Sequence, residues 1–292
     1  MKKSILFLIS LFPFFVMCQN SNKKEEIALV FPSDTIPMQY SPDYPSFRIP
    51  ILDGIVNDSL YLKVFFDTGT DVNRFSISDS YKNLFVNDSA FVQIGKFKKQ
   101  MRIIFWGNNQ KSFFDMFGKN TILVGWRFFE NKIIEFDFQN QRILVYEELP
   151  DITEYSKIEI TLFKNSTTGN SALLIPAQVV LQGKIMQDTF KIDTGCNDCM
   201  VLSSKHIEEQ GSDTTNASYY NSTVVAGGVR SSFSILADTI KIGDLYVANQ
   251  NMRITFSDYN GRGLLGTPTM ENFSVILDLI NYDLYLKKIN KE

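Results

Sequence analysis

The sequence is poor in histidine and cysteine, with one histidine and three cysteines among 292 residues. His206 is the only candidate base for a Ser-His or Cys-His mechanism, and its polar surroundings are typical of a short surface helix. A structural zinc site takes four ligands, usually cysteine and histidine. Beyond the N-terminal segment only Cys196 and Cys199 remain to join that histidine. These shortages argue against a zinc site and against a histidine-based hydrolase.

The sequence also lacks an excess of either charge. It contains 29 basic and 32 acidic residues, which gives a formal net charge of −3, and no block of basic residues stands out. Nucleic acid is therefore not an expected partner. Hydrophobic residues make up 44% of the chain, which indicates a folded protein, and the 25 Phe and 12 Tyr favour strands over helices.

The first residues form a separate unit. Lys2 and Lys3 precede a nearly continuous apolar stretch that is shorter than the roughly 20 residues of a membrane span. This pattern predicts an export signal over 1–19, followed by a polar tether over 20–26, with an N-terminal core helix as the alternative. Cys18 lies where a bacterial lipoprotein carries its lipid, although Met17 replaces the usual small residue, so ordinary cleavage near Cys18 stays open.

We therefore expect an exported protein of the bacterial periplasm, outer membrane or cell surface. A lipid on Cys18 is one route by which it would attach to a membrane.

The rest of the chain repeats itself once. Pro50 and Pro176 each precede an Asp-Thr-Gly sequence, and the aspartates, Asp67 and Asp193, follow seventeen residues after each proline. Each interval contains two β-type segments joined by a polar turn. The turns lie at 57–59 and 182–184. A repeat of this length indicates a duplicated structural unit.

The distal parts of the halves correspond as well. Gly125 and Gly266 each end an apolar segment, and they lie 141 residues apart. Aspartates that we expect to cap turns recur at the same separation, at Asp137 and Asp278. The sequence therefore predicts a mainly β protein of two homologous lobes, over 26–148 and 157–292, with a short helix after each glycine. Opening strands are predicted at 27–31 and 158–163.

The halves differ after the Asp-Thr-Gly sequences, where the second half is about 22 residues longer. The additional residues include two β-type runs around Ala226, Gly227 and Gly228, which predict a hairpin with a mobile tip. The first half instead carries an aromatic-rich insertion over 105–120, which would either line a cleft or form a local core.

Two Asp-Thr-Gly sequences, each with the same lead-in and the same distal glycine, resemble the aspartic protease superfamily. Its pepsin-like and retropepsin-like members share the order apolar-apolar-Asp-Thr-Gly, a flap, and apolar-apolar-Gly before a short helix. The resemblance covers nearly all of the chain after the signal and implies two acid-protease-like β-barrel lobes with a cleft between them. A single Asp-Thr-Gly would more simply be a turn.

The resemblance implies that Asp67 and Asp193 form a catalytic dyad that activates water to cleave peptide bonds. Two adjacent carboxyls share one proton, so neither is assigned a separate role, and no cofactor or metal is needed. The residues expected to support the two loops are Thr68, Gly69, Thr70, Thr194 and Gly195. The flap, which would hold a peptide or protein substrate, is expected at Ala226, Gly227 and Gly228.

Two departures from the family pattern leave a second hypothesis open. Cys196 follows the second Asp-Thr-Gly, where the family commonly has Ser, Thr or Ala, and the flap lies in the second half rather than the first. The alternative is an inactive protease-like module that binds peptides or glycans at the cell envelope. Cys196 and Cys199 would be a disulfide, two free thiols or a redox pair.

Because the chain carries both aspartates, we expect a monomer rather than a dimer built through the second lobe.

Overall fold

The computed structural model describes residues 29–41, 47–76, 89–105, 121–167, 169–203, 207, 209, 211, 218–225, 228–248, 253–257 and 263–289. The predictions for the export signal and tether, Cys18, the insertion beyond 105, His206, Ala226 and Gly227 lie outside these residues. In the described part of the chain, no helix has the length and apolar character needed to cross a membrane.

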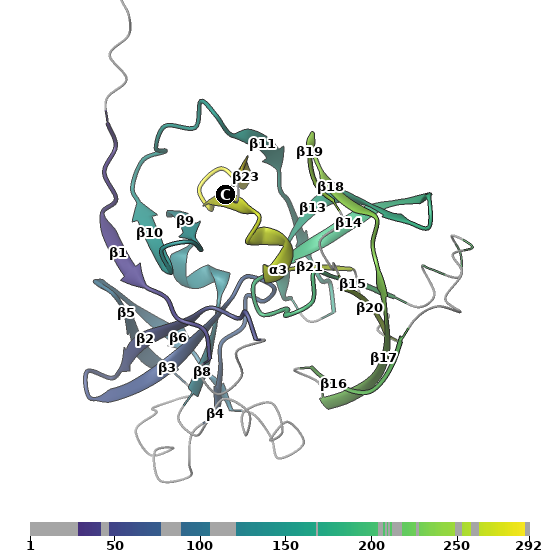
Figure 1. The fold of residues 1–292 in the computed structure, drawn as a ribbon. Helices are drawn as coiled ribbons and strands as arrows, with labels where there is room; N and C mark the ends of the chain where they lie inside the picture. Colours follow the sequence, from purple (N-terminus) through teal and green to yellow (C-terminus); the bar gives the residue numbers. More distant parts are fainter. Residues whose placement is uncertain are drawn as a thin grey trace, which may run out of the picture.

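The protein is mainly β, as the sequence predicts, and its described strands form three sheets (Figure 1). The first half builds a seven-stranded sheet in the order β6 (Phe97–Arg102), β5 (Ser89–Ile94), β2 (Ile51–Val56), β3 (Leu60–Asp67), β8 (Thr121–Gly125), β4 (Arg74–Ser76) and β7 (Ile104–Phe105). Alternating buried and exposed side chains along β2 and β5 give this sheet one face toward the core.

The second half builds the largest sheet. Its order is β16 (Ser218–Val225), β17 (Gly228–Leu236), β20 (Arg253–Ser257), β15 (Met200–Ser203), β21 (Leu264–Gly266), β14 (Lys184–Asp193), β13 (Ser171–Leu181), β18 (Thr239–Ile242) and β19 (Leu245–Ala248), and β12 (Thr161–Lys164) pairs with β13. The predicted additional hairpin of this half is formed by β16 and β17.

The sequence repeat corresponds to a repeated strand arrangement. In the first half β3 pairs in parallel with β8, so that Asp67 lies opposite Gly125. In the second half β14 pairs in parallel with β21, so that Asp193 lies opposite Gly266. A short helix follows each glycine, as predicted: the 3-10 helix η3 (Trp126–Phe129) and the α-helix α3 (Thr267–Met270).

A third, six-stranded sheet combines strands from both halves, and in Figure 1 it lies above the sheet of the first half and beside the sheet of the second half. Its order is β1 (Asp34–Pro37), β10 (Arg142–Tyr146), β9 (Ile133–Asp137), β22 (Phe273–Asp278), β23 (Asp283–Lys288) and β11 (Ser156–Glu159). At its centre β9 pairs with β22, which joins the halves through backbone hydrogen bonds.

The turns of this sheet explain the repeated aspartates. The backbone N–H of Asn140 donates to Asp137 Oδ1 at 3.2 Å, and that of Asn281 donates to Asp278 Oδ1 at 3.0 Å. Both aspartates therefore cap the turn of a hairpin, β9–β10 and β22–β23 respectively, and the prediction of a turn role is confirmed.

One predicted strand is wrong. Residues 29–32 form no strand, and the side chains of Leu29 and Phe31 are 79% and 77% exposed. The first strand is β1, which begins after Pro32 and pairs with β10. Proline has no N–H to donate to a strand ladder, so pairing starts beyond it, where the backbone N–H of Ser33 donates to the carbonyl of Val145 at 2.7 Å.

Candidate active site

The two Asp-Thr-Gly loops meet where the halves join. Asp67 ends β3 and Asp193 ends β14, and their half-buried carboxyls are hydrogen-bonded to each other. A Cβ added to Gly69 would lie 2.3 Å from Asp193 Cγ, and one added to Gly195 would lie 2.7 Å from Asp67 Cγ. Each glycine thus lies against the carboxyl of the opposite loop, where no side chain fits.

The threonines of the two loops bind each other in a crossed arrangement. The backbone N–H of Thr68 donates to Thr194 Oγ1, and that of Thr194 donates to Thr68 Oγ1, both at 3.0 Å. Each hydroxyl then donates onward to a strand of the opposite half, Thr68 to the carbonyl of Ile192 at 3.0 Å and Thr194 to that of Phe66 at 2.7 Å. Both threonines are almost completely buried, so these four bonds fix one loop against the other in a site closed to water.

The distal glycines and their helices close the loops from behind. A Cβ at Gly125 would lie 2.4 Å from the carbonyl oxygen of Thr70, and one at Gly266 would lie 1.9 Å from that of Asp198. The first N–H of each helix donates to its loop, Trp126 to the carbonyl of Thr70 at 3.0 Å and Thr267 to that of Cys196 at 3.1 Å. The glycines therefore allow a close contact that any larger residue would prevent.

The surroundings of the two carboxyls favour a shared proton. Burial raises the pKa of Asp67, although the N–H of Gly69, which donates to Asp67 Oδ1 at 2.7 Å, acts in the opposite direction. Burial raises the pKa of Asp193 well above its usual value, and the charge of Asp67 raises it further. The positive charge of Lys191 lowers both pKa values in part. The pair therefore keeps a proton at a pH where separate aspartates would both be ionised.

These raised pKa values predict how the stability of the protein depends on pH. Between about pH 4, where unfolded aspartate titrates, and the raised pKa of the pair, the folded state binds more protons than the unfolded state. The free energy of unfolding should therefore fall as the pH rises through this window. Each pH unit contributes at most about 1.4 kcal/mol, and less where water reaches the carboxyls.

Urea unfolding of the wild type and of Asp193→Asn between pH 4 and pH 8 measures this effect. The variant lacks the coupled proton, so its stability relative to the wild type should increase as the pH rises. Taking the difference between the two proteins removes the contributions of other carboxyls, such as Asp137, whose pKa is lowered by its hydrogen bonds to Asn140 and Arg142 even though partial burial opposes this. A difference that stays constant with pH would contradict the raised pKa values.

The residues that follow the two Asp-Thr-Gly sequences differ in chemistry. Thr70 Oγ1 accepts a hydrogen bond from the N–H of Val72 at 3.1 Å. Cys196 Sγ lies 3.6 Å from the carbonyl oxygen of Asp198, and burial together with the charge of Asp193 raises the pKa of its thiol. Cys196 and Cys199 are both buried and are not joined by a disulfide, so the disulfide alternative is not present.

Sequence reasoning missed an ionic network beside the first loop. Asp71 Oδ2 accepts hydrogen bonds from Arg127 Nε at 3.2 Å and from the N–H of Ser171 at 2.7 Å, and Arg127 also contacts Ser171 and Glu130. Since Ser171 belongs to the second half, this network is a further connection between the halves.

A related network lies beside the second loop. Asn197 Oδ1 accepts the N–H of Arg48 at 2.6 Å, and the Arg48 side chain pairs with Glu271 at 3.0 Å. Asp71 and Asn197 both stand two residues after the glycine of their loop, and Glu130 and Glu271 are 141 residues apart. The repeat spacing was thus the signal that could have identified these residues.

The predicted flap is only partly described. Gly228 is the first residue of β17, while the tip at 226–227 lies outside the described residues. Among the residues that the structure describes, no group of three or more His, Cys, Asp or Glu side chains could hold a metal ion.

Comparisons with known proteins find similarity among solved structures. No family model matches the chain, and no curated protein matches it. Among solved structures, a retropepsin-like aspartic protease from Rickettsia conorii is 21% identical, with a TM-score of 0.32, over 45% of this chain and 93% of that chain.

Proposed function

We propose that this chain is an aspartic-type endopeptidase, in which Asp67 and Asp193 activate a water molecule to cleave peptide bonds. The observation that carries the proposal is the pair of mutually hydrogen-bonded carboxyls at the meeting point of two loops that are fixed by crossed threonine bonds. A structural turn needs only one Asp-Thr-Gly and no partner. Two half-buried carboxyls in contact lower the stability of the fold, and groups whose pKa values are perturbed in this way cluster at functional sites.

The chemistry follows from one proton shared between two carboxyls. The ionised carboxylate takes a proton from a water molecule while the protonated carboxyl donates a hydrogen bond to the carbonyl oxygen of the peptide. The oxygen of the water attacks the carbonyl carbon and forms a tetrahedral intermediate. Its collapse breaks the C–N bond, the leaving nitrogen receives a proton from the dyad, and the products are a carboxylic acid and an amine.

The proposed substrate is an extended peptide. The hairpin of β16 and β17 supplies a flap of the kind that binds a peptide through backbone hydrogen bonds. The strands that end at Asp67 and Asp193 each pair with a neighbour on both sides, β3 with β2 and β8 and β14 with β13 and β21, which gives the rigid support that a catalytic pair needs.

The test is cleavage of a mixed peptide library by residues 21–292, scanned from acid to neutral pH. The double variant Asp67→Asn, Asp193→Asn serves as the blank for contaminating proteases. We expect cleavage by the wild type only. Its pH range should extend above that of ordinary aspartates, because the pair shares a proton with raised pKa values.

The second candidate is an inactive module that binds peptides or glycans, and Cys196 is the observation in its favour. A thiol is a weaker hydrogen-bond donor than the hydroxyl that Thr70 has at the equivalent position. A folded wild type that cleaves nothing at any pH, yet binds members of the library, would support this candidate over the endopeptidase.

A further inference from the structure

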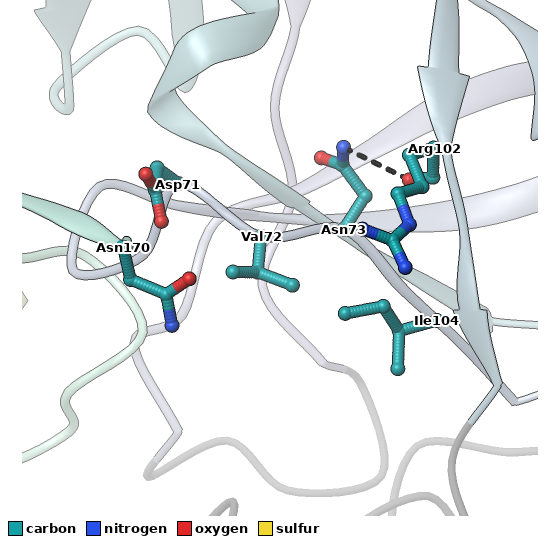
Figure 2. Close-up of a pocket in the computed structure, with 6 residues that line it drawn as sticks. All are labelled: Asp71, Val72, Asn73, Arg102, Ile104 and Asn170. Atoms are coloured by element: carbon teal, nitrogen blue, oxygen red, sulfur yellow. Dashed lines mark hydrogen bonds between the residues drawn. The ribbon is translucent and has the colours of Figure 1, made fainter. Parts of the chain in front are cut away.

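A cavity of about 170 Å³ lies beside the first Asp-Thr-Gly loop (Figure 2). It is lined by Asp71, Val72, Asn73, Arg102, Ile104 and Asn170. Asp71 is four residues from Asp67, and four residues span at most about 14 Å. An extended peptide advances about 3.3 Å per residue, so Asp71 at the edge of this cavity lies within the length of about four peptide residues from Asp67.

At one end of the cavity a hydrogen-bond acceptor is left unused. The side chain of Asp71 is only 7% exposed, and Arg127 and Ser171 bind its Oδ2. Its Oδ1 is buried and has no hydrogen-bond partner within the described part of the chain. A buried acceptor without a donor costs free energy, so a small movement of the side chain that turns this oxygen toward a ligand N–H would be favourable.

The other end of the cavity presents a positive charge. Arg102 is the last residue of β6, and Figure 2 shows its guanidinium turned toward Asn73 and Ile104. Its backbone carbonyl accepts a hydrogen bond from Asn73 Nδ2 at 3.4 Å, which connects this end to the loop. Among the described residues, Arg102 has no carboxylate partner, whereas Lys98 and Lys99 of the same strand both have one.

Two apolar side chains, Val72 and Ile104, also line the cavity. In Figure 2 Val72 lies between Asp71 and Arg102, and Ile104 lies beside the guanidinium of Arg102. The cavity thus offers an acceptor for an N–H, an apolar wall and a cationic fork for a carboxylate. Asp71 does not neutralise the guanidinium of Arg102, because its charge is paired with Arg127.

We propose that this cavity selects an acidic residue of the peptide substrate, glutamate above all, and that Arg102 determines this specificity. The peptide N–H donates to Asp71 Oδ1, the side-chain methylenes lie against Val72 and Ile104, and the carboxylate pairs with the guanidinium of Arg102. The inference rests on the proposed function only in taking a peptide as the ligand, because binding does not require cleavage.

The experiment measures binding and cleavage separately. Peptides that carry Glu, Gln or Leu at each of the four positions on either side of the cleaved bond are tested at pH 6, where glutamate is ionised. Fluorescence anisotropy with Asp193→Asn gives affinities without turnover, and kcat/KM of the wild type gives the specificity of cleavage. If no peptide bond is cleaved, positions cannot be counted from a cleavage site. Glu, Gln and Leu are then placed in turn at each position of chosen library peptides, and the affinities are measured.

We expect one position at which Glu is favoured over Gln by about three- to tenfold. Arg102→Gln should abolish this preference and Arg102→Lys should restore part of it. Lys98→Gln, which removes a charge from the same strand, should leave it unchanged. The preference should also weaken in high salt and below about pH 4, where glutamate is protonated.

The two proposals fail in different ways. Cleavage without a Glu preference at any position, or with a preference that Arg102→Gln leaves intact, overturns the role of Arg102 while the endopeptidase proposal stands. Binding with an Arg102-dependent Glu preference but no cleavage supports the inference and rejects the endopeptidase.

Discussion

Replacing either Asp67 or Asp193 by asparagine is expected to reduce kcat/KM for peptide cleavage about a thousandfold or more. Asparagine keeps the size of the side chain but neither accepts nor releases the shared proton. In the proposed mechanism the two groups act as one unit, because their side chains share a proton through a hydrogen bond. The double variant should therefore lose no more activity than either single variant, because one missing carboxyl already removes the proton-sharing pair.

The matched control is Asp53→Asn, at an exposed aspartate of β2 whose carboxylate pairs with Lys63. It should keep the activity of the wild type. Circular dichroism and urea unfolding show whether each variant is folded, and at neutral pH we expect Asp193→Asn to be at least as stable as the wild type. A folded Asp67→Asn protein with wild-type kcat/KM would reject the dyad.

The parts of the fold that depend on local spacing were predictable from the sequence. Several short motifs occur twice, so that each copy supports the interpretation of the other. They are the Asp-Thr-Gly sequence, the distal glycine and the turn-capping aspartate at Asp137 and Asp278. The β16–β17 hairpin was predictable because the second half is longer than the first after its Asp-Thr-Gly sequence, and the first half shows the length without a hairpin.

The parts that depend on non-local pairing were not predictable. The central pair of the six-stranded sheet aligns Glu135 with Ile276, which are 141 residues apart, and no local pattern indicates that β9 and β22 are neighbours. The error at 27–31 has a similar cause, since apolar Leu29 and Phe31 suggest a strand but pairing with β10 begins only after Pro32. The pattern of apolar residues indicates that a strand can form, whereas pairing with a neighbouring strand determines the residue at which it starts.

The network of Asp71 shows the same limit at the candidate site. Asp71, Arg127 and Ser171 come from three segments, and only the folded chain brings them together. Their repeat positions could have singled out Asp71, but not the Oδ1 that has no hydrogen-bond partner among the described residues, nor the position of Arg102 in the lining of the same cavity. The proposed specificity therefore depends on geometry that the motif alone does not contain.

The crossed threonines give the largest expected effect on stability. Thr68→Val keeps the shape of the side chain but leaves the N–H of Thr194 and the carbonyl of Ile192 without this partner, and Thr194→Val does the same to Thr68 and Phe66. Each buried group left unpaired costs roughly 1–3 kcal/mol, so each variant should lose about 2–4 kcal/mol of unfolding free energy. Urea unfolding measures the loss, with m unchanged if the folded state keeps its compactness.

Serine at either position is the matched control, because it keeps the hydroxyl and removes only a methyl group. Thr68→Ser and Thr194→Ser should each lose about 1 kcal/mol. Since the two threonines bind each other, the double valine variant should lose less than the sum of the single variants. The valine variants should also lose peptide cleavage under conditions where they are still folded, because the crossed bonds hold the two carboxyls in contact. Valine variants that unfold like the serine variants would show that packing, rather than these hydrogen bonds, joins the two loops.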